Sequence, residues 1–143
     1  MLLGEYEHTI DDKNRLTLPA KFRAGFADGV VLSFSQDGCL EAYPVAEYER
    51  TISARITAID PISKESRVMR RAYFASATVT EMDKQGRVVL PANLAGRCEI
   101  AKDVVVIGLY DHAEIWNRDA WRVAATDAEG RVDDVAERLA KLD

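Results

Sequence analysis

The chain contains one sequence pattern twice. The first copy runs from Ile10 to Ala20, and the second runs from Met82 to Ala92, 72 residues later. Both copies read apolar-Asp-x-x-[Asn/Gly]-Arg-apolar-x-Leu-Pro-Ala. A shared tail follows in each half, where Leu40-Glu41-Ala42-Tyr43 matches Ala113-Glu114-Ile115-Trp116. An internal repeat predicts two structural units that share one architecture.

The repeat divides the chain into four segments. We expect a first unit over residues 4–50 and a second over residues 76–122. A helical linker is expected between them over residues 51–75, and residues 123–143 form an acidic helical tail.

Each copy of the pattern predicts two short strands joined by a tight turn. Asn14 and Gly86 hold the same place in the two turns, and these residue types best tolerate left-handed backbone angles. Asp11 and Asp83 can accept hydrogen bonds from the turn's own backbone. The sequence therefore predicts a hairpin in each unit, with strands at 5–10, 15–18, 78–82 and 87–90.

Further elements follow each motif. Pro19 and Pro91 predict short helices over 20–26 and 92–96, because proline fits the first turn of a helix. Runs of β-branched residues predict buried strands at 30–34 and 104–109. A further strand is expected in each unit, at 40–43 and 114–116. In the linker, Asp60 is expected to cap a helix that has Pro61 at its first position.

Composition is that of an ordinary soluble globular protein, with 48% hydrophobic and 30% charged residues. The longest apolar run, residues 104–110, is too short to span a bilayer. The first residues show no signal-peptide pattern. Cys39 and Cys98 are not at equivalent positions, which predicts two free thiols. We expect a cytoplasmic protein.

The net charge of −5 argues against nucleic-acid binding, but the charge is unevenly distributed. Residues 50–71 carry six bases and two acids, whereas residues 127–143 carry six acids and three bases. Total charge therefore says little about any one face.

The turn residues Lys13 and Arg15 are the main candidates for DNA contact. Arg15 offers a planar fork of donors that suits guanine O6 and N7, or phosphate. Lys13 suits phosphate. Arg87 and Lys84 are lesser candidates in the second copy. Alternatively, Asp11 and Arg15 pair only to stabilise the turn. The two roles are compatible, because a paired aspartate can also orient the arginine.

These doubled motifs resemble the MraZ family of bacterial transcriptional regulators, which are built from two units similar to the AbrB/SpoVT DNA-binding domain. The resemblance covers residues 1–122. It implies a mixed α+β, β-rich fold in which both repeats form one double-psi, swapped-hairpin β-barrel with short flanking helices. The family's usual glycine before the first arginine is Asn14 here.

The resemblance also implies a function. Family members assemble as homo-oligomeric rings, bind short G-rich direct repeats in double-stranded DNA upstream of their own division and cell-wall gene cluster, and usually repress it. Such a protein would be associated with the nucleoid. The main DNA contacts map to Lys13 and Arg15, with Arg87 secondary or structural.

The sequence leaves two other functional classes open. Asp11 and Asp83 could form an aspartate-dyad hydrolase, but each is followed by an arginine and lacks the Asp-Thr/Ser-Gly signature. A ring scaffold that does not bind DNA would not need Lys13 and Arg15. His8 and His112 have no ligand-like spacing to a cysteine. No metal, cofactor, small-molecule substrate or membrane partner is therefore expected.

Overall fold

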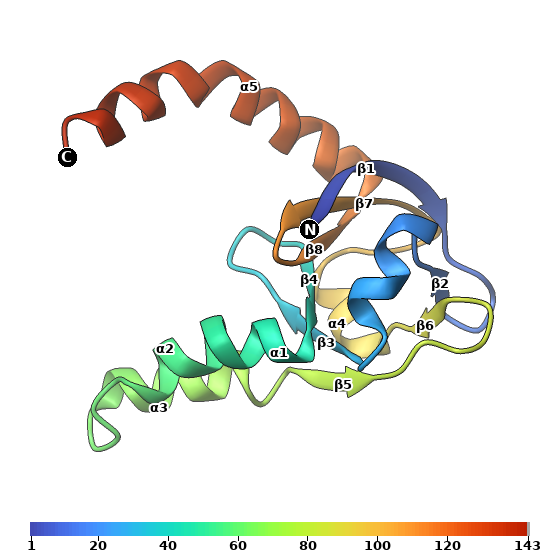
Figure 1. The fold of residues 1–143 in the computed structure, drawn as a ribbon, viewed down its shortest axis with the longest axis horizontal. Coiled ribbons are helices and arrows are strands. Elements are labelled where there is room, and N and C mark those ends of the chain that lie inside the picture. Colours follow the sequence, from blue (N-terminus) through green and yellow to red (C-terminus); the bar gives the residue numbers. More distant parts are fainter. Residues whose placement is uncertain (143) are drawn as a thin grey trace.

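The computed structural model describes residues 1–142, and its largest element is a six-stranded antiparallel sheet (Figure 1). The strands come from both halves of the chain, so neither repeat forms a sheet alone. In spatial order they are β1 (Leu2–Thr9), β7 (Asp103–Tyr110), β8 (Ala113–Asn117), β4 (Leu40–Pro44), β3 (Val30–Phe34) and β5 (Thr78–Thr80).

A second, two-stranded sheet joins the two motifs. It consists of β2 (Arg15–Thr17) and β6 (Arg87–Val89), paired antiparallel with Leu16 opposite Val88. Each predicted turn is closed locally, by a hydrogen bond from Asp11 N to the Arg15 carbonyl at 3.1 Å and from Asp83 N to the Arg87 carbonyl at 2.9 Å. Beyond these bonds and an isolated bridge between Ile10 and Leu16, no strand ladder forms within either motif in residues 1–142, so the predicted strand pairing inside each hairpin is wrong. The strands pair across repeats instead, because both motifs bury their alternate leucine and valine side chains in the same core.

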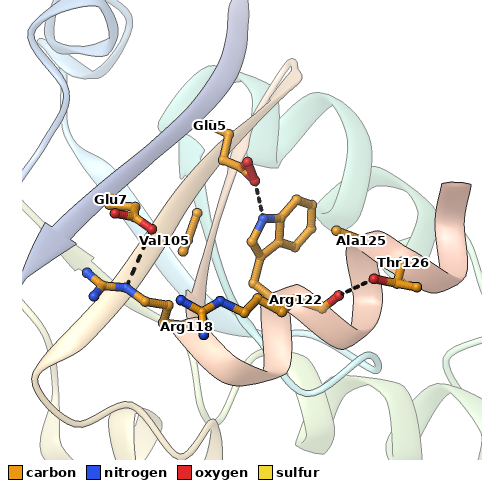
Figure 2. Close-up of a pocket in the computed structure, with 8 residues that line it drawn as sticks. Glu5, Glu7, Val105, Arg118, Arg122, Ala125 and Thr126 are labelled. Carbon is orange, nitrogen blue, oxygen red and sulfur yellow. Dashed lines mark hydrogen bonds and ion pairs between the residues drawn. The ribbon is translucent and has the colours of Figure 1, made fainter.

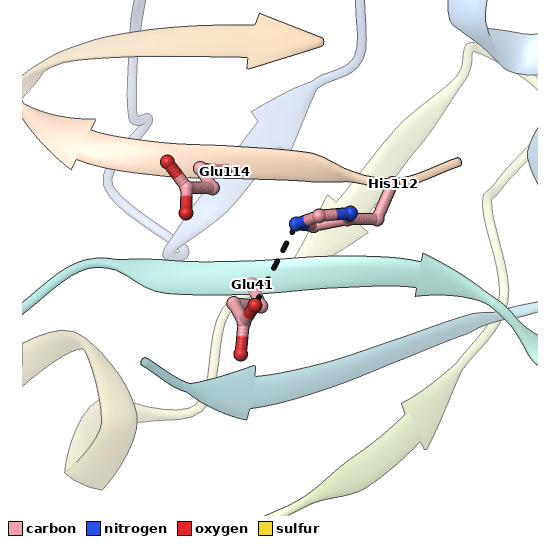
Figure 3. A group of neighbouring side chains, drawn as sticks. All are labelled: Glu41, His112 and Glu114. Carbon is pink, nitrogen blue, oxygen red and sulfur yellow. Dashed lines mark ion pairs between the residues drawn. The ribbon is translucent and has the colours of Figure 1, made fainter. Parts of the chain in front are cut away.

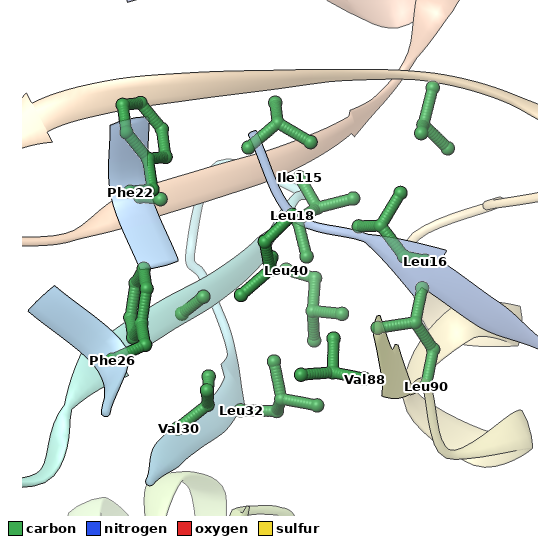
Figure 4. Packing of buried hydrophobic residues seen from close by; sticks show 14 of the residues in the cluster. Leu16, Leu18, Phe22, Phe26, Val30, Leu32, Leu40, Val88, Leu90 and Ile115 are labelled. Carbon is green, nitrogen blue, oxygen red and sulfur yellow. The ribbon is translucent and has the colours of Figure 1, made fainter. Parts of the chain in front are cut away.

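The main core lies between the two sheets (Figure 4). Strand alternation turns Leu16, Leu18, Val88 and Leu90 inward, and each is at most 1% exposed. The short helices that follow the prolines close this core. They are the 3₁₀ helix η1 (Ala20–Phe26) and α4 (Ala92–Arg97), which bury Phe22, Phe26 and Leu94. The predicted helices after Pro19 and Pro91 are thus confirmed.

The mixed α/β class is confirmed, with a mostly antiparallel main sheet. Residues 1–142 form two separate sheets and not one closed barrel. The physical reason lies in β2 and β6, which are three residues long and pair with each other. Their ladder therefore does not continue into the larger sheet.

The segment after β4 is helical and projects from the sheet. It runs through α1 (Val45–Tyr48), the π-helical η2 (Glu49–Ser53) and α2 (Ala54–Thr57), and α3 (Lys64–Tyr73) returns beside it (Figure 1). The predicted cap at Asp60 is wrong. Asp60 Oδ1 instead accepts the backbone N–H of Ile62 in a turn. Ser63 caps α3, accepting the N–H of Ser66 at 3.1 Å.

The last helix, α5 (Arg118–Ala140), is continuous across the expected boundary at residues 122 and 123. It begins at Asn117, whose Oδ1 accepts the N–H groups of Asp119 and Ala120. Its first turns pack on the sheet through Trp121, and the rest extends away from the body (Figure 1). Within residues 1–142, no helix combines the length and apolar character needed to cross a membrane.

Candidate nucleic-acid interface

The two motif turns have the same internal geometry. Asp11 Oδ1 accepts the backbone N–H groups of Lys13 and Arg15, both at 2.9 Å. Asp11 Oδ2 accepts Arg15 Nε at 2.7 Å. Asp83 makes the same three hydrogen bonds, with the same distances, to Gln85 and Arg87. The expected pairing of aspartate with arginine is therefore present in both copies.

These hydrogen bonds keep both aspartates ionised. The backbone N–H of Arg15 is the largest cause that lowers the pKa of Asp11 below its usual 3.8, and the Arg15 side chain adds to it. Arg87 lowers the pKa of Asp83 in the same way. A hydrolytic dyad needs two carboxylates that share a proton, which raises one pKa. The aspartate-dyad interpretation therefore fails on this geometry.

The pairing uses one nitrogen of each guanidinium. Within residues 1–142, no hydrogen bond engages the Nη groups of Arg15 or Arg87. Each arginine side chain is 27% exposed and its aspartate 38% exposed. The aspartate thus orients the guanidinium through Nε, while the Nη groups can donate to an acceptor outside the chain.

Each turn is bound by the strand end of the other repeat. Leu18 N donates to the carbonyl of Gly86 at 2.9 Å, and Leu90 N donates to the carbonyl of Asn14 at 2.8 Å. Asn14 and Gly86 have φ of 58° and 78°, so the left-handed conformation expected at both positions is confirmed. These contacts place the two turns side by side at one edge of the molecule (Figure 1).

Lys13 and Lys84 are exposed in the two turns. The repeats differ here, since Asp12 stands beside Lys13 where Lys84 stands beside Gln85. The four basic residues predicted from the motifs, Lys13, Arg15, Lys84 and Arg87, are therefore carried by two adjacent turns.

Arg23 is a further basic residue at this edge that the motif did not reveal. It extends from η1, and its Nε donates to the carbonyl of Leu18 at 3.1 Å. Its guanidinium lies over the second turn, so a Cβ placed on Gly86 would come within 2.3 Å of Arg23 Nε. The corresponding position in the second repeat is Ala95. The presence of arginine in only one repeat was the one sequence signal for Arg23, and this position lies outside the pattern that the two motif copies share.

The arginines of the linker lie elsewhere. Arg67, Arg70 and Arg71 are on α3, which projects on the opposite side of the body from the turns (Figure 1). Arg67 donates to the carbonyl of Ile62, and Arg70 donates to Ser66 Oγ. These residues do not extend the basic surface formed by the turns.

A pocket between β1 and the start of α5 holds groups that already pair with each other (Figure 2). Arg118 lies 3.8 Å from both Glu7 and Asp103. Trp121 Nε1 donates to Glu5. These contacts attach α5 to the sheet, and they give the pocket a structural role.

A second polar cluster lies on the outer face of the sheet. It contains Glu41, His112 and Glu114, whose ligand-type atoms all lie within 4.8 Å of one another (Figure 3). Burial raises the pKa of Glu41 to about 7, and the charge of His112 opposes that rise. Sequence spacing gave no reason to expect this cluster, because strand pairing brings its members together. Both cysteines are buried and free, as predicted.

Comparison with known proteins supplies the family. The model of a family described as "MraZ protein, putative antitoxin-like" matches the chain twice, over residues 1–71 and 73–143. A "Transcriptional regulator MraZ" from Thermoanaerobacter pseudethanolicus is 39% identical over 142 residues, which is 99% of each chain. A protein of the same name from Herpetosiphon aurantiacus is 46% identical over 122 residues, or 85% of each chain. One from Ligilactobacillus salivarius is 38% identical over 143 residues.

Proposed function

The chain belongs to the MraZ family of transcriptional regulators, which are not enzymes, and from this premise we propose that it binds specific DNA through its two motif turns. The target is a set of short G-rich direct repeats upstream of its own division and cell-wall gene cluster. Binding represses that promoter and keeps the protein on the nucleoid.

One observation carries the proposal. Arg15 sits in an exposed turn, held through Nε by Asp11, with its Nη groups available. A guanidinium fixed in this way can donate two parallel hydrogen bonds to guanine O6 and N7 in the major groove. Lys13, two residues earlier, is placed to contact the adjacent phosphate. The G-rich target and the arginine donor are therefore chemically matched.

The second turn adds a lesser contribution. Arg87 repeats the geometry of Arg15, and Lys84 adds a charge beside it. Because the turns are side by side, both can approach one duplex. We assign base contact to Arg15 and backbone contact to Lys84 and Arg87, and Asp11, Asn14, Asp83 and Gly86 serve to shape the turns.

The barrel and the segment boundaries belong to the same proposal. The cross-repeat pairing of β2 with β6, and the exchanged hydrogen bonds at Asn14 and Gly86, support a swapped-hairpin, double-psi barrel. The two sheets would form the wall of this barrel without one continuous ladder. The double match of the family model supports two units, which we place at residues 4–50 and 76–122, with the linker at 51–75 and the tail at 123–143.

Assembly accounts for binding by an acidic chain. One protomer presents only a few basic side chains and has a net charge of −5. Contacts between so few basic side chains and DNA are weak in physiological salt. In a homo-oligomeric ring, several protomers would bind successive DNA repeats, and the effective concentration of each later contact would be high. The ring therefore supplies the affinity, and each turn supplies the specificity.

The test is fluorescence anisotropy with a duplex that carries the G-rich repeats, beside a scrambled duplex, over a salt series. Wild-type protein should bind the repeat duplex selectively. Arg15→Ala should lose that selectivity and keep its oligomeric state in light scattering. Arg55→Ala is the matched control, because Arg55 is exposed on α2. Equal, weak and salt-sensitive binding to both duplexes would support the alternative of a ring scaffold that does not recognise DNA sequence.

A further inference from the structure

Three side chains with metal-ligating groups converge on the outer face of the main sheet (Figure 3). Glu41 belongs to β4, Glu114 belongs to β8, and His112 directly precedes β8. We propose that Glu41, His112 and Glu114 form a binding site for one first-row divalent cation, with Zn²⁺ as the best match.

The sheet register holds the two glutamates together. Glu41 and Glu114 are directly opposite each other in the antiparallel pair of β4 and β8. Their neighbours Leu40, Ala42 and Ile115 are in the main core, so both glutamates point to the opposite face. Opposed residues in a ladder have Cβ atoms about 5 Å apart. The two carboxylates are therefore fixed at close range by the backbone.

A cation would relieve the repulsion between the two carboxylates. Like charges directly opposite each other destabilise a sheet, and the effect grows when the charges are buried. Glu114 is 8% exposed and the Glu41 side chain is 13% exposed. In the described part of the chain, no lysine or arginine forms an ion pair with either glutamate. A divalent cation between them would neutralise both charges.

His112 is oriented as a metal ligand. Its Nδ1 lies 2.6 Å from Asp111 Oδ1, and its ring stacks on Tyr43 at 4.3 Å between centroids. These contacts direct Nε2 toward Glu41, with 3.6 Å to Oε2. A carboxylate on the second nitrogen is the usual way in which proteins fix a metal-binding histidine. Ligand atoms around a tetrahedral zinc ion lie about 3.3–3.5 Å apart, close to this separation.

Glu114 is also positioned in advance. Trp116 Nε1 donates to Glu114 Oε1 at 2.9 Å, which fixes the carboxylate plane. Imidazole and carboxylate are both groups that zinc binds in proteins, and with three protein ligands a water molecule would fill the fourth position. Glu41 and His112 retain 13–14% exposure, which provides a path for the ion and the water.

The site would join the two repeats. Glu41 lies in the first repeat, and His112 and Glu114 lie in the second. Glu41 and Glu114 are equivalent in the repeat, whereas the equivalent of His112 is Cys39, which is fully buried. The expected consequence of binding is stabilisation of the fold, because a cation bound only by the native state raises Tm.

The test uses full-length protein treated with a chelator, then titrated with Zn²⁺ by calorimetry and unfolded thermally with and without Zn²⁺. Wild type should bind one Zn²⁺ per protomer and show a higher Tm in its presence. Glu41→Gln, Glu114→Gln and His112→Gln should each weaken Zn²⁺ binding by at least roughly tenfold, since even outer partners of a metal site contribute that much. Mg²⁺, which prefers six oxygen ligands, should not replace Zn²⁺.

Two controls make the result specific. His8→Gln removes the other histidine of the chain and should leave Zn²⁺ binding unchanged. Glu49→Gln removes an exposed carboxylate on η2 and should do the same. Without metal, Glu41→Gln should fold with an equal or higher Tm, because it removes one of two facing charges. Undetectable Zn²⁺ binding in wild type, or wild-type Zn²⁺ affinity in both Glu41→Gln and Glu114→Gln, would overturn the proposal.

Discussion

The carbonyl of Asn14 accepts a hydrogen bond from the backbone N–H of Leu90 at 2.8 Å, although 76 positions separate the two residues. The reciprocal bond joins Leu18 to Gly86 at 2.9 Å. Each turn is therefore shaped partly by the other repeat. A change in one turn should also affect the opposite motif.

Replacing Arg15 with lysine should separate charge from base recognition. Lysine keeps the positive charge but lacks the planar fork. We expect Arg15→Lys to retain weak, salt-dependent binding to any duplex and to lose roughly tenfold to a hundredfold of its preference for the G-rich repeats. Competition between specific and scrambled duplexes at fixed salt measures this ratio. An unchanged ratio would mean that Arg15 contributes charge alone.

Arg87→Ala should weaken DNA binding far less than Arg15→Ala. Both substitutions remove the same bond to an aspartate, so their effects on the turns are matched. A difference in DNA affinity then reports on DNA contact rather than on turn stability. Fluorescence anisotropy measures the DNA affinities, and thermal unfolding checks that the two variants are equally stable. Equal losses of affinity would show that both repeats contact bases.

Substitutions at the two left-handed turn positions should differ in their effect on the stability of the fold. Gly86→Ala should destabilise the fold by about 1–2 kcal/mol, because Gly86 has φ of 78° and a Cβ would displace Arg23. Asn14→Gly should change stability by less than about 1 kcal/mol, since glycine adopts this conformation freely. Chemical denaturation of both variants measures the difference. Similar values for the two would indicate that the second turn rearranges.

The turns should lose stability at acidic pH. The pKa values of Asp11 and Asp83 are lowered below 3.8 in the folded protein, chiefly by backbone N–H groups. An acid whose pKa falls on folding stabilises the native state above its unfolded pKa, and this contribution disappears as pH drops through the folded pKa. The loss should therefore appear below about pH 4. Unfolding of Asp11→Asn and Asp83→Asn should show a smaller change over that range than wild type.

Removal of residues 127–143 should leave the body folded. The described part of this segment is almost entirely exposed, and its ion pairs are intrahelical, such as Arg131 with Asp127 at 3.5 Å. Such pairs contribute a few tenths of a kcal/mol. We expect the free energy of unfolding to change by less than about 1 kcal/mol. A larger loss would show that the distal part of α5 supports assembly, which light scattering of the truncated protein would detect directly.

Local chemistry made much of the fold predictable. Proline after each motif predicted η1 and α4, and the β-branched runs predicted β3 and β7 close to their observed bounds. The turn conformation at Asn14 and Gly86 followed from residue type alone. Such features depend on steric preferences within a few residues, so they can be inferred from neighbours along the chain.

Pairing between distant segments was decided by the tertiary structure. Hydrogen-bonding capacity is the same in every strand, so the motif could not show that β2 pairs with β6 and not with the strand before it. The cap of α3 shifted to Ser63 because Asp60 formed a competing turn. Arg23 reached the second turn through the same long-range packing.

The sequence by itself therefore determined the repeat, the turn chemistry, the basic residues that are candidates for DNA contact, and the family. The tertiary structure decided which strands meet, and with them which charges lie close together. Glu41 and Glu114 show the difference, since 73 positions separate them in sequence and the ladder of β4 and β8 sets them face to face. Their proximity results from register, a property of two paired strands that neither segment encodes alone.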